Sequence, residues 1–346
     1  MNPVLVNLWR GNAIESRHRG SVAVVRSDGQ LMMSMGDVLN HTFPRSAIKF
    51  LQAIPFVESG AIEHYSLNEA HIALSCASHN GESVHVDMVS DWLKLIGCDA
   101  ENLECGADMP MHEATKYELL AQGDGPTRIH HNCSGKHLGL LSTCQHHGED
   151  IKNYRLYSHN ANRRWFDVLE SMSGTRVMQL PWGYDGCGIP CLALPLQRVA
   201  LAMARFADAA GQSAERTAAI ARIQSAVSAH SYLVAGKDRL CTELMQLLAP
   251  KVLVKVGAEG CYTACIPEQG LGIALKMDDG HDRGARVALG AVLRTLGVID
   301  ANIVVELEEY LKPELTNSRG EPVGRAESSS EWESVSIKEQ QLPLSL

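Results

Sequence analysis

The sequence predicts an α+β fold, in which a mixed or antiparallel sheet is built from both chain ends and a helical insert lies between them. Strand patterns occur near the N-terminus and again after residue 250, whereas helical patterns fill most of the chain between. The N-terminal signal is a hairpin in which residues 22–25 and 30–35 flank the Asp28-Gly29 turn. This order of elements indicates that the two chain ends share the sheet.

The individual elements follow from apolar spacing and from the glycines and prolines that separate them. We expect helices over residues 46–60, 82–96, 112–122, 136–146, 160–171, 196–209, 215–230, 239–249 and 280–296. The apolar stretch that ends at Ser78 is predicted to be a strand or a short buried segment. Three further strands are expected over residues 252–256, 260–266 and 271–277.

The 346 residues, 45% of them hydrophobic, suffice for a large core. We expect a single domain over residues 1–312 and a C-terminal tail over residues 313–346. The tail is rich in Ser and Glu and has few apolar anchors beyond Trp332 and Leu342. We therefore predict that the tail lies on the surface or is partly disordered.

The charge and apolar patterns exclude several classes of protein. A net charge of −9 without a basic stripe argues against nucleic acid as the main partner. The longest apolar runs are too short for a membrane span, and the N-terminus carries no signal-peptide pattern. We therefore expect a cytoplasmic protein with no membrane partner, whose ten cysteines are mostly reduced.

The most informative stretch is Arg45-Ser46-Ala47-Ile48-Lys49, which follows Pro44. Residues three apart share one face of a helix, so a helix opening near Ser46 would hold the Lys49 amine beside the serine hydroxyl. A serine needs an adjacent base to act as a nucleophile near neutral pH. A desolvated lysine can be that base, because burial disfavours its charged form.

Two later segments extend this pattern. Ser78-His79-Asn80 follows a buried-looking run, and Lys255-Val256-Gly257 follows an apolar strand. Ser-x-x-Lys, Ser-x-Asn and Lys-x-Gly in this order form the three-part pattern of serine β-lactamases and penicillin-binding enzymes. The strict Lys-Thr-Gly form is absent, and the first two parts lie close together for a β-lactamase.

Two thiols lie in segments dense in reactive groups. Cys133 precedes Ser134, Gly135 and Lys136 at a helix start, and Cys187 follows Asp185 in a tight turn. A thiolate-containing site favours zinc. The alternative is a pair of buried structural thiols, and the residues alone leave both readings open.

Taken together, these segments resemble the L-asparaginase II family, the rhizobial-type asparaginases. The resemblance covers the chain from about residue 10 to about residue 300. The matching pieces are Arg45-Ser46-Ala47-Ile48-Lys49, Cys76-Ala77-Ser78-His79, Asn132-Cys133-Ser134-Gly135-Lys136-His137, Asp185-Gly186-Cys187, Arg239-Leu240-Cys241-Thr242, Lys255-Val256-Gly257-Ala258 and Gly270-Leu271-Gly272-Ile273-Ala274-Leu275-Lys276.

The resemblance implies hydrolysis of L-asparagine to L-aspartate and ammonia by a homodimer with a fold akin to serine β-lactamases and glutaminases. The residues that it assigns fall into three groups. The catalytic residues are Ser46, Lys49, Ser78 and Lys255; the substrate-binding residues are Arg45, His79, Asp185 and Cys241; and the ligands of one zinc ion are Cys133, Lys136 and Cys187.

Two other functions remain open from the sequence. One is a cytoplasmic serine-lysine amidohydrolase that resembles a β-lactamase or a peptidase, and the other is a non-catalytic zinc-binding protein. The release of ammonia from asparagine separates the three hypotheses. The asparaginase releases ammonia, the lactam hydrolase does not, and the binding protein turns nothing over.

Overall fold

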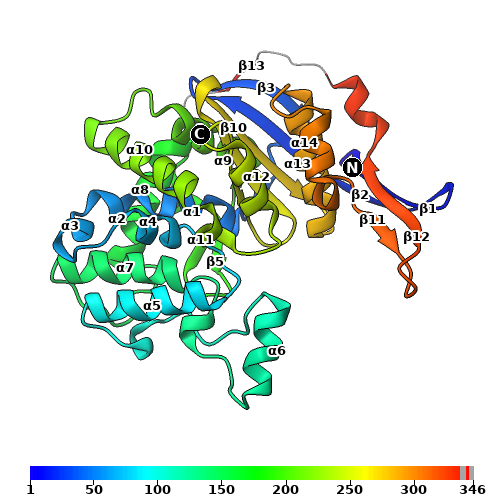
Figure 1. Cartoon of the computed structure of the whole chain (residues 1–346). Coiled ribbons are helices and arrows are strands. Elements are labelled where there is room, and N and C mark those ends of the chain that lie inside the picture. The colour runs from blue at the N-terminus through cyan, green and yellow to red at the C-terminus, as the bar shows by residue number, and fades with distance from the viewer. Residues whose placement is uncertain (336–339, 343–346) are drawn as a thin grey trace. The chain divides into compact units, whose positions relative to one another are not determined.

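The computed structural model describes residues 1–335 and 340–342, which form two compact units (Figure 1). Unit 1 comprises residues Met1–Ala47, Leu194–Asp208 and Val254–Leu346, and unit 2 comprises Ile48–Ala193 and Ala209–Leu253. Unit 1 therefore contains both ends of the chain, and most of unit 2 is a long helical insert. This arrangement confirms the predicted α+β class, with the sheet shared by the chain ends.

A nine-stranded sheet forms the centre of unit 1, and the strand pairings within the described residues are antiparallel. Its main path runs β11-β12-β1-β2-β10-β9-β8, and β3 pairs with β2 and β13. The strands are β1 (Val4–Arg10), β2 (Ala13–Arg26), β3 (Gln30–Met35), β8 (Leu253–Val256), β9 (Cys261–Ile266), β10 (Leu271–Met277), β11 (Glu314–Thr316), β12 (Pro322–Ser328) and β13 (Gln340–Gln341). Two short ladders pair β4 (His41–Thr42) with β7 (Leu194–Pro195) and β5 (Trp182–Tyr184) with β6 (Pro190–Leu192).

Strand β2 joins the N-terminal strands to those near the C-terminus. Its first half pairs with β1, and its second half pairs with both β3 and β10. The predicted hairpin is confirmed, because Val22 faces Met35 and Val24 faces Met33. The three strands predicted between residues 252 and 277 are also confirmed as β8, β9 and β10.

Two helices cover opposite faces of the sheet. A Cβ on Gly272 of β10 would lie 2.1 Å from the carbonyl oxygen of Ala200 in α9 (Leu196–Asp208). Gly284 of α13 (Asp282–Thr295) packs against Met277, the last residue of β10. Since alternate strand residues point to opposite faces, positions 272 and 277 place the two helices on different sides. Two short helices, α14 (Ala301–Glu306) and α15 (Glu308–Leu311), follow α13.

Unit 2 is largely helical, and its α7 packs against several of the other helices. Every residue of α7 from Ser134 to Cys144 is buried, so the helix has no solvent face over this length. The helices of unit 2 are α1 (Lys49–Gln52), α2 (Ile54–Glu58), α3 (Ala61–His64), α4 (Glu69–Ser75), α5 (Ser83–Leu95), α6 (Glu113–Ala121), α7 (Ser134–His146), α8 (Asn160–Ser173), α10 (Ala214–Ala229), α11 (Ser231–Ala235) and α12 (Leu240–Leu248). Short 3₁₀ turns occur at η1 (Arg45–Ile48), η2 (Ala100–Asn102), η3 (Arg128–His130), η4 (Val177–Gln179), η5 (Pro267–Gln269) and η6 (Ser330–Ser334).

One sequence prediction about the first helices is wrong. The continuous helix predicted over residues 46–60 is a 3₁₀ turn followed by the short helices α1 and α2. Pro55 lies in the first turn of α2, where its missing N–H is tolerated, so a new helix starts there. Of the two alternatives predicted for the stretch before Ser78, the short buried segment is correct, since the stretch forms the short helix α4, which Asn68 caps.

The C-terminal segment is more ordered than the sequence suggests. Strand β12 pairs with β1 over residues 324–328, and the side chains of Ala326 and Trp332 are buried. The boundary predicted at residue 312 therefore does not coincide with an end of the sheet. Leu342, the other predicted anchor, is buried, whereas residues 336–339 and 343–346 lie outside the described residues.

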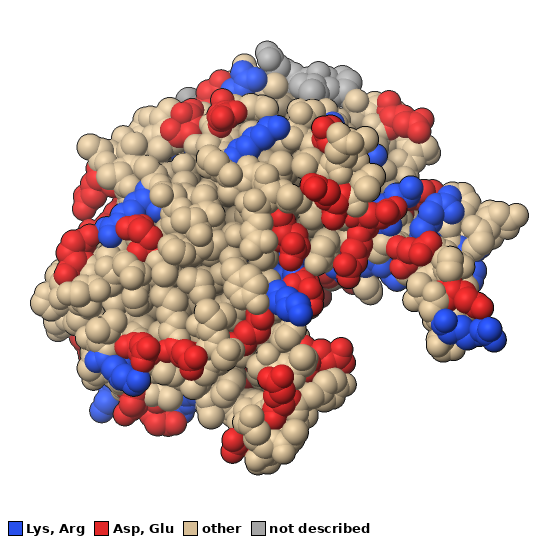
Figure 2. All heavy atoms as spheres, viewed as in Figure 1, with Lys and Arg blue, Asp and Glu red and all other residues tan. Residues whose placement is uncertain are grey.

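The surface in Figure 2 carries Asp and Glu side chains interspersed with Lys and Arg. This face therefore offers no continuous positive surface for a nucleic acid. Within residues 1–335 and 340–342, no helix has both the length and the apolar character that a membrane crossing requires. All ten cysteines are free thiols, as expected from the sequence.

Candidate active site

A fully buried lysine lies at the centre of a polar cluster in unit 2. Lys49, the first residue of α1, donates hydrogen bonds from Nζ to Ser78 Oγ at 3.1 Å and to Cys133 Sγ at 3.1 Å. It also donates to the carbonyl oxygen of Ala77. These three bonds use all the donors of an ammonium group, so the charge is compensated although water is excluded.

The close approach of α7 to α4 places Cys133 beside Ser78. A Cβ on Gly135 would lie 2.1 Å from the carbonyl oxygen of Leu74, so only glycine permits this contact. The segment that follows α4 is held by backbone hydrogen bonds to two other segments of the chain. Ser78 N–H donates to the Val234 carbonyl at 2.9 Å, and His79 N–H donates to the Asn132 carbonyl at 3.2 Å.

A second buried lysine lies among the two thiols that the sequence singles out. Lys136 Nζ lies 3.0 Å from Cys187 Sγ, and Cys187 is hydrogen-bonded to Cys133. The hydrogen bond from Cys187 lowers the pKa of Cys133 well below its usual value, and the nearby ammonium groups of Lys49 and Lys136 add to this effect. The pKa of Cys187 is correspondingly raised, because the Cys133 sulfur and burial both retain its proton.

The charge on Lys136 is stabilised by its neighbours. Burial alone would lower its pKa, but the two sulfurs and the Asp185 carboxylate outweigh burial and raise the pKa. Asp185 itself is partly exposed and belongs to a tight turn, in which the Gly188 N–H donates to the Asp185 carbonyl at 2.9 Å. A thiolate, a second thiol and a carboxylate thus surround one cation.

His79 is buried and neutral. Its Nδ1 accepts the N–H of Gly81 at 3.1 Å, so Nε2 carries the proton and donates to Ser134 Oγ at 2.8 Å. Burial, together with His85 and Lys49, lowers the pKa of His79 well below its usual value. The ring of His79 also stacks on His85, with centroids 5.0 Å apart.

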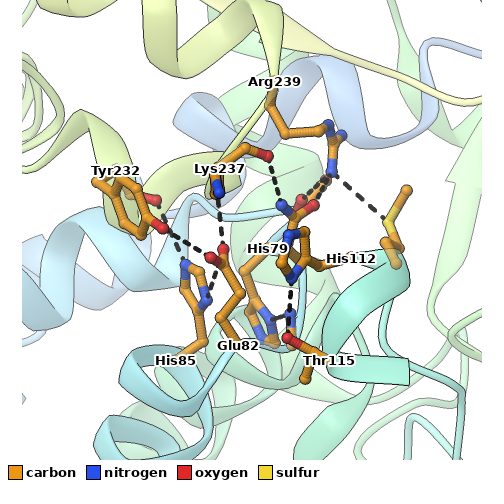
Figure 3. A network of polar contacts seen from close by, with 12 residues as sticks. His79, Glu82, His85, His112, Thr115, Tyr232, Lys237 and Arg239 are labelled. Atoms are coloured by element: carbon orange, nitrogen blue, oxygen red, sulfur yellow. Dashed lines mark hydrogen bonds and ion pairs between the residues drawn. The ribbon is translucent and has the colours of Figure 1, made fainter. Parts of the chain in front are cut away.

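The segment after His79 is anchored by the carboxylate of Glu82, which Figure 3 shows between Tyr232 and Lys237. Glu82 accepts the Tyr232 hydroxyl at 2.6 Å and the Lys237 N–H at 3.1 Å. Burial alone would raise the pKa of Glu82, but these hydrogen bonds outweigh it and hold the pKa below its usual value. Burial and the same carboxylate raise the pKa of Tyr232 to about 12.

Glu82 and Lys237 link the segment 78–82 to the segment 236–239, and further hydrogen bonds join the same two segments. Arg239, which directly precedes α12, donates to Asn80 Oδ1 at 2.8 Å and to the Ser78 carbonyl at 3.4 Å (Figure 3). Asn80 in turn donates to the Lys237 carbonyl at 2.8 Å. The segments 78–82 and 236–239 are therefore clamped together, and Ser78 is fixed through its own backbone.

Unit 1 holds the other predicted catalytic residues. Ser46 is partly exposed in the 3₁₀ turn η1, and α1 begins only at Lys49. Arg45 has a φ of 53° and lines a cavity of about 520 Å³ together with Glu259, Lys276 and Asp278. Lys255 is fully buried on β8, and its Nζ donates to the Val256 carbonyl at 2.9 Å.

The predicted site residues thus fall into two groups. Unit 2 brings together two of the predicted catalytic residues, two predicted substrate-binding residues and the three predicted zinc ligands, namely Lys49, Ser78, His79, Asp185, Cys133, Lys136 and Cys187. Cys241 is also in unit 2, buried in the first turn of α12. Unit 1 holds Arg45, Ser46 and Lys255.

The comparisons with known proteins agree with these motifs. A family model described as L-asparaginase II matches residues 6–328. The chain belongs to the L-asparaginase II family. No curated protein matches the chain.

Solved structures of Mglu resemble the chain only distantly. Mglu in its native form is 12% identical, with a TM-score of 0.43 over 88% of this chain and 71% of that chain. The native form in the presence of NaCl is also 12% identical, with a TM-score of 0.42 over 88% of this chain and 68% of that chain.

The donor set of this asparaginase-family chain fits a zinc ion. Two cysteine sulfurs and one lysine nitrogen converge at a buried position, and soft sulfur ligands with nitrogen are typical of zinc. Within residues 1–335 and 340–342, no group of three or more His, Cys, Asp or Glu residues could hold a metal ion. The zinc ion that the sequence predicts at Cys133, Lys136 and Cys187 stays a prediction.

Sequence reasoning missed the roles of Glu82 and Tyr232. Glu82 is the N-cap residue of α5 but makes no capping hydrogen bond, because its carboxylate turns toward Tyr232 and Lys237. Glutamate is an unusual N-cap residue, and this is the one weak signal that the sequence carries. Tyr232 could not be found, because its partner lies 150 residues away in the chain.

Proposed function

We propose that the chain is an L-asparaginase that hydrolyses L-asparagine to L-aspartate and ammonia through an acyl-serine intermediate. Besides membership of the family, one structural observation supports this proposal. Lys49 is fully buried and donates to the Ser78 hydroxyl at 3.1 Å. A hydrogen bond between a buried lysine and the Ser78 hydroxyl supports a proton relay through Ser78, while the assignment of Ser46 as the nucleophile rests on the resemblance to the family.

In the proposed reaction, Ser46 attacks the side-chain amide carbon of asparagine. Lys49, or Lys255 acting through Ser78, takes the serine proton and later returns it to the leaving ammonia. The C–N bond breaks as the acyl-serine ester forms, and water then cleaves the ester to release aspartate. A lysine can take the proton only after losing its own, which burial favours.

Substrate binding is assigned to charged groups of opposite sign. The Asp185 carboxylate suits the α-amino group of the substrate, and the Arg45 guanidinium suits its α-carboxylate. His79 and Cys241 complete the proposed set, in which the neutral His79 donates its Nε2–H to Ser134 Oγ. A zwitterionic amino acid requires both charges to be matched, which a purely apolar pocket cannot do.

Zinc would be held by Cys133, Lys136 and Cys187. When bound, zinc would polarise nearby groups and fix the positions of its ligands. Lys136 must release its proton to become a ligand, so bound metal and the protonated amine compete. We favour an organising role for the metal, since Ser46 and the two lysines already provide the nucleophile and the base.

The serine β-lactamase-like fold, the homodimer and the cytoplasmic location belong to this proposal. The resemblance to the family supports the fold and the homodimer, whereas the cytoplasmic location remains the expectation stated from the sequence.

The proposal is tested by a substrate panel read by ammonia release. Purified protein should release ammonia from L-asparagine, with and without a chelator. Hydrolysis of a β-lactam with no ammonia from asparagine would support a lactam hydrolase instead. Zinc binding without turnover of any substrate would support a binding protein.

A further inference from the structure

Ser46 lies in a turn whose backbone is held in an unfavourable conformation. The Ala47 N–H donates to the Pro44 carbonyl at 3.0 Å and closes the turn around Arg45 and Ser46. Arg45 has a φ of 53°, in the left-handed region that the Cβ of an L-residue disfavours. Such a conformation persists only where the surrounding structure imposes it.

The chain that connects β8 to β9 lies directly against this turn. A Cβ on Gly257 would lie 2.5 Å from the Pro44 carbonyl oxygen and 3.1 Å from the Ala47 nitrogen. Gly257 has no positive φ, so glycine is required here for space and not for backbone freedom. The same residue donates its N–H to the Cys261 carbonyl at 2.7 Å, which closes the connection at the start of β9.

One side chain links the turn to the sheet itself. The Thr263 hydroxyl on β9 donates to the Ala47 carbonyl at 2.6 Å, and both residues are fully buried. Thr263 lies opposite Ala274 of β10 in an antiparallel ladder, so its backbone is fixed on that side. Valine has the same shape and suits a buried strand equally well, so the hydroxyl is the feature that the strand itself does not require.

We propose that Thr263 is a positioning residue, which holds the nucleophile turn in place through the Ala47 carbonyl. The proposal rests on the proposed function, in which Ser46 attacks the substrate. Thr263 touches the turn one residue beyond Ser46 and acts through the backbone. A displacement of the nucleophile by about 1 Å can cost about 100-fold in rate.

The test compares two variants of Thr263, one without and one with a hydroxyl, and a control variant at another buried threonine. Thr263→Val removes the donor at nearly constant shape, and Thr263→Ser keeps it. Thr143→Val is the matched control, because the buried Thr143 hydroxyl also donates to a backbone carbonyl, that of Gly139, at 2.8 Å. The measurements are kcat and KM for ammonia release from L-asparagine, together with the melting temperature of each variant.

We expect Thr263→Val to lower kcat by about 10- to 100-fold while KM changes less than about threefold. Thr263→Ser should recover kcat to within about threefold of wild type. Thr143→Val should keep the wild-type kcat even if it lowers the melting temperature as much as Thr263→Val does. A purely structural role of Thr263 would make the two valine variants equal in kcat, and this result overturns the proposal.

The companion variant Ser46→Ala separates this inference from the proposed function. If Ser46→Ala retains activity, or if wild type releases no ammonia, the nucleophile assignment fails and the role of Thr263 fails with it. If Ser46→Ala is inactive while Thr263→Val keeps the wild-type kcat, only the positioning role is overturned.

Discussion

At the scale of single residues, the account depends on Lys49. Its side chain is fully buried and bonded to Ser78, Cys133 and the Ala77 carbonyl. Each of these contacts gives the buried amine a hydrogen-bond partner in the dry interior. They also place the amine where it can exchange a proton with a serine hydroxyl.

Replacing Lys49 with arginine should abolish most activity. Arginine stays protonated and cannot serve as a base, so we expect Lys49→Arg to lower kcat for ammonia release by about 100-fold or more. Lys94→Arg is the matched control, since Lys94 is exposed and pairs only with Asp91 among the described ion pairs. A fully active Lys49→Arg enzyme would exclude Lys49 as the base.

Buried histidines make the fold sensitive to mild acid. Burial, together with the neighbouring Lys136 charge, lowers the pKa of His137 well below 6.5, and its Nδ1 lies 2.6 Å from the Tyr154 hydroxyl. In the unfolded chain this histidine takes up a proton below about pH 6.5, whereas in the folded protein it stays neutral. Stability is therefore unaffected by His137 above that pH and falls below it.

We expect the free energy of unfolding to decrease between pH 6.5 and 5.5, by up to about 1.4 kcal/mol per pH unit for each such histidine. His137→Gln should reduce this slope, because one titrating group is removed. Urea unfolding at several pH values measures it. An unchanged slope in His137→Gln would mean that His137 takes up its proton equally in the folded state.

At the scale of elements, the segments 78–82 and 236–239 act as a clamp that fixes Ser78. Glu82 and Asn80 accept or donate hydrogen bonds across the clamp, and Gly236 packs between them. A Cβ on Gly236 would lie 2.3 Å from Glu82 Oε2, at a φ of 102° that disfavours any side chain.

Gly236→Ala should therefore destabilise the protein and reduce activity together. The control is Gly97→Ala, because Gly97 also has a positive φ, of 66°, but no atom lies within 4 Å of its added Cβ. We expect Gly236→Ala to cost on the order of 2 kcal/mol more than Gly97→Ala in unfolding free energy. An equal loss of unfolding free energy in the two variants would show that the segments 78–82 and 236–239 accommodate the added methyl group without cost.

The sequence predicted the elements whose pattern is local and strong. The amphipathic helices α8 and α13 and the β-branched strand β9 were found because their apolar spacing is regular. The sequence leaves the stretch that forms helix α4 as a strand or a short buried segment, because a short, largely buried helix is an apolar run without clear periodicity. The sequence does not predict strand β12, since it carries few apolar residues and only Ala326 of the strand is fully buried.

The site was predicted as a set of motifs but not as a geometry. The three-residue spacing points to Ser46 and Lys49, and the order of the three motifs adds Ser78. Cys133 and Cys187 are indicated by segments dense in reactive groups. The bonds that fix these groups, such as Thr263 to Ala47 and Glu82 to Tyr232, join residues more than 100 positions apart. No local pattern in the sequence records such contacts.

At the scale of the whole molecule, a metal would couple several distant segments. Cys133 is the N-cap residue of α7, Lys136 lies on α7, and Cys187 lies in the turn between β5 and β6. A ligand that binds all three in the folded protein alone would stabilise that state by mass action. Zinc should therefore raise the melting temperature of the protein.

The double variant Cys133→Ser and Cys187→Ser should lose stoichiometric zinc, as measured by elemental analysis of purified protein. The control is Cys98→Ser with Cys144→Ser, which replaces two thiols outside the cluster. Zinc affinity should rise with pH, because Lys136 has a raised pKa and must give up its proton to bind. Full zinc content in the Cys133 and Cys187 variant would place the metal elsewhere and remove Lys136 from the ligands.

The central claim is that Ser46 carries the acyl group during asparagine hydrolysis. The most direct measurement is to quench the enzyme in acid within its first turnovers, digest it and locate the added aspartyl group by mass spectrometry. The account predicts an aspartyl ester on the peptide that contains Ser46, and its absence in Ser46→Ala, which releases no ammonia. An ester on Ser78, with ammonia release retained in Ser46→Ala, would contradict the account and reverse the roles of the two serines.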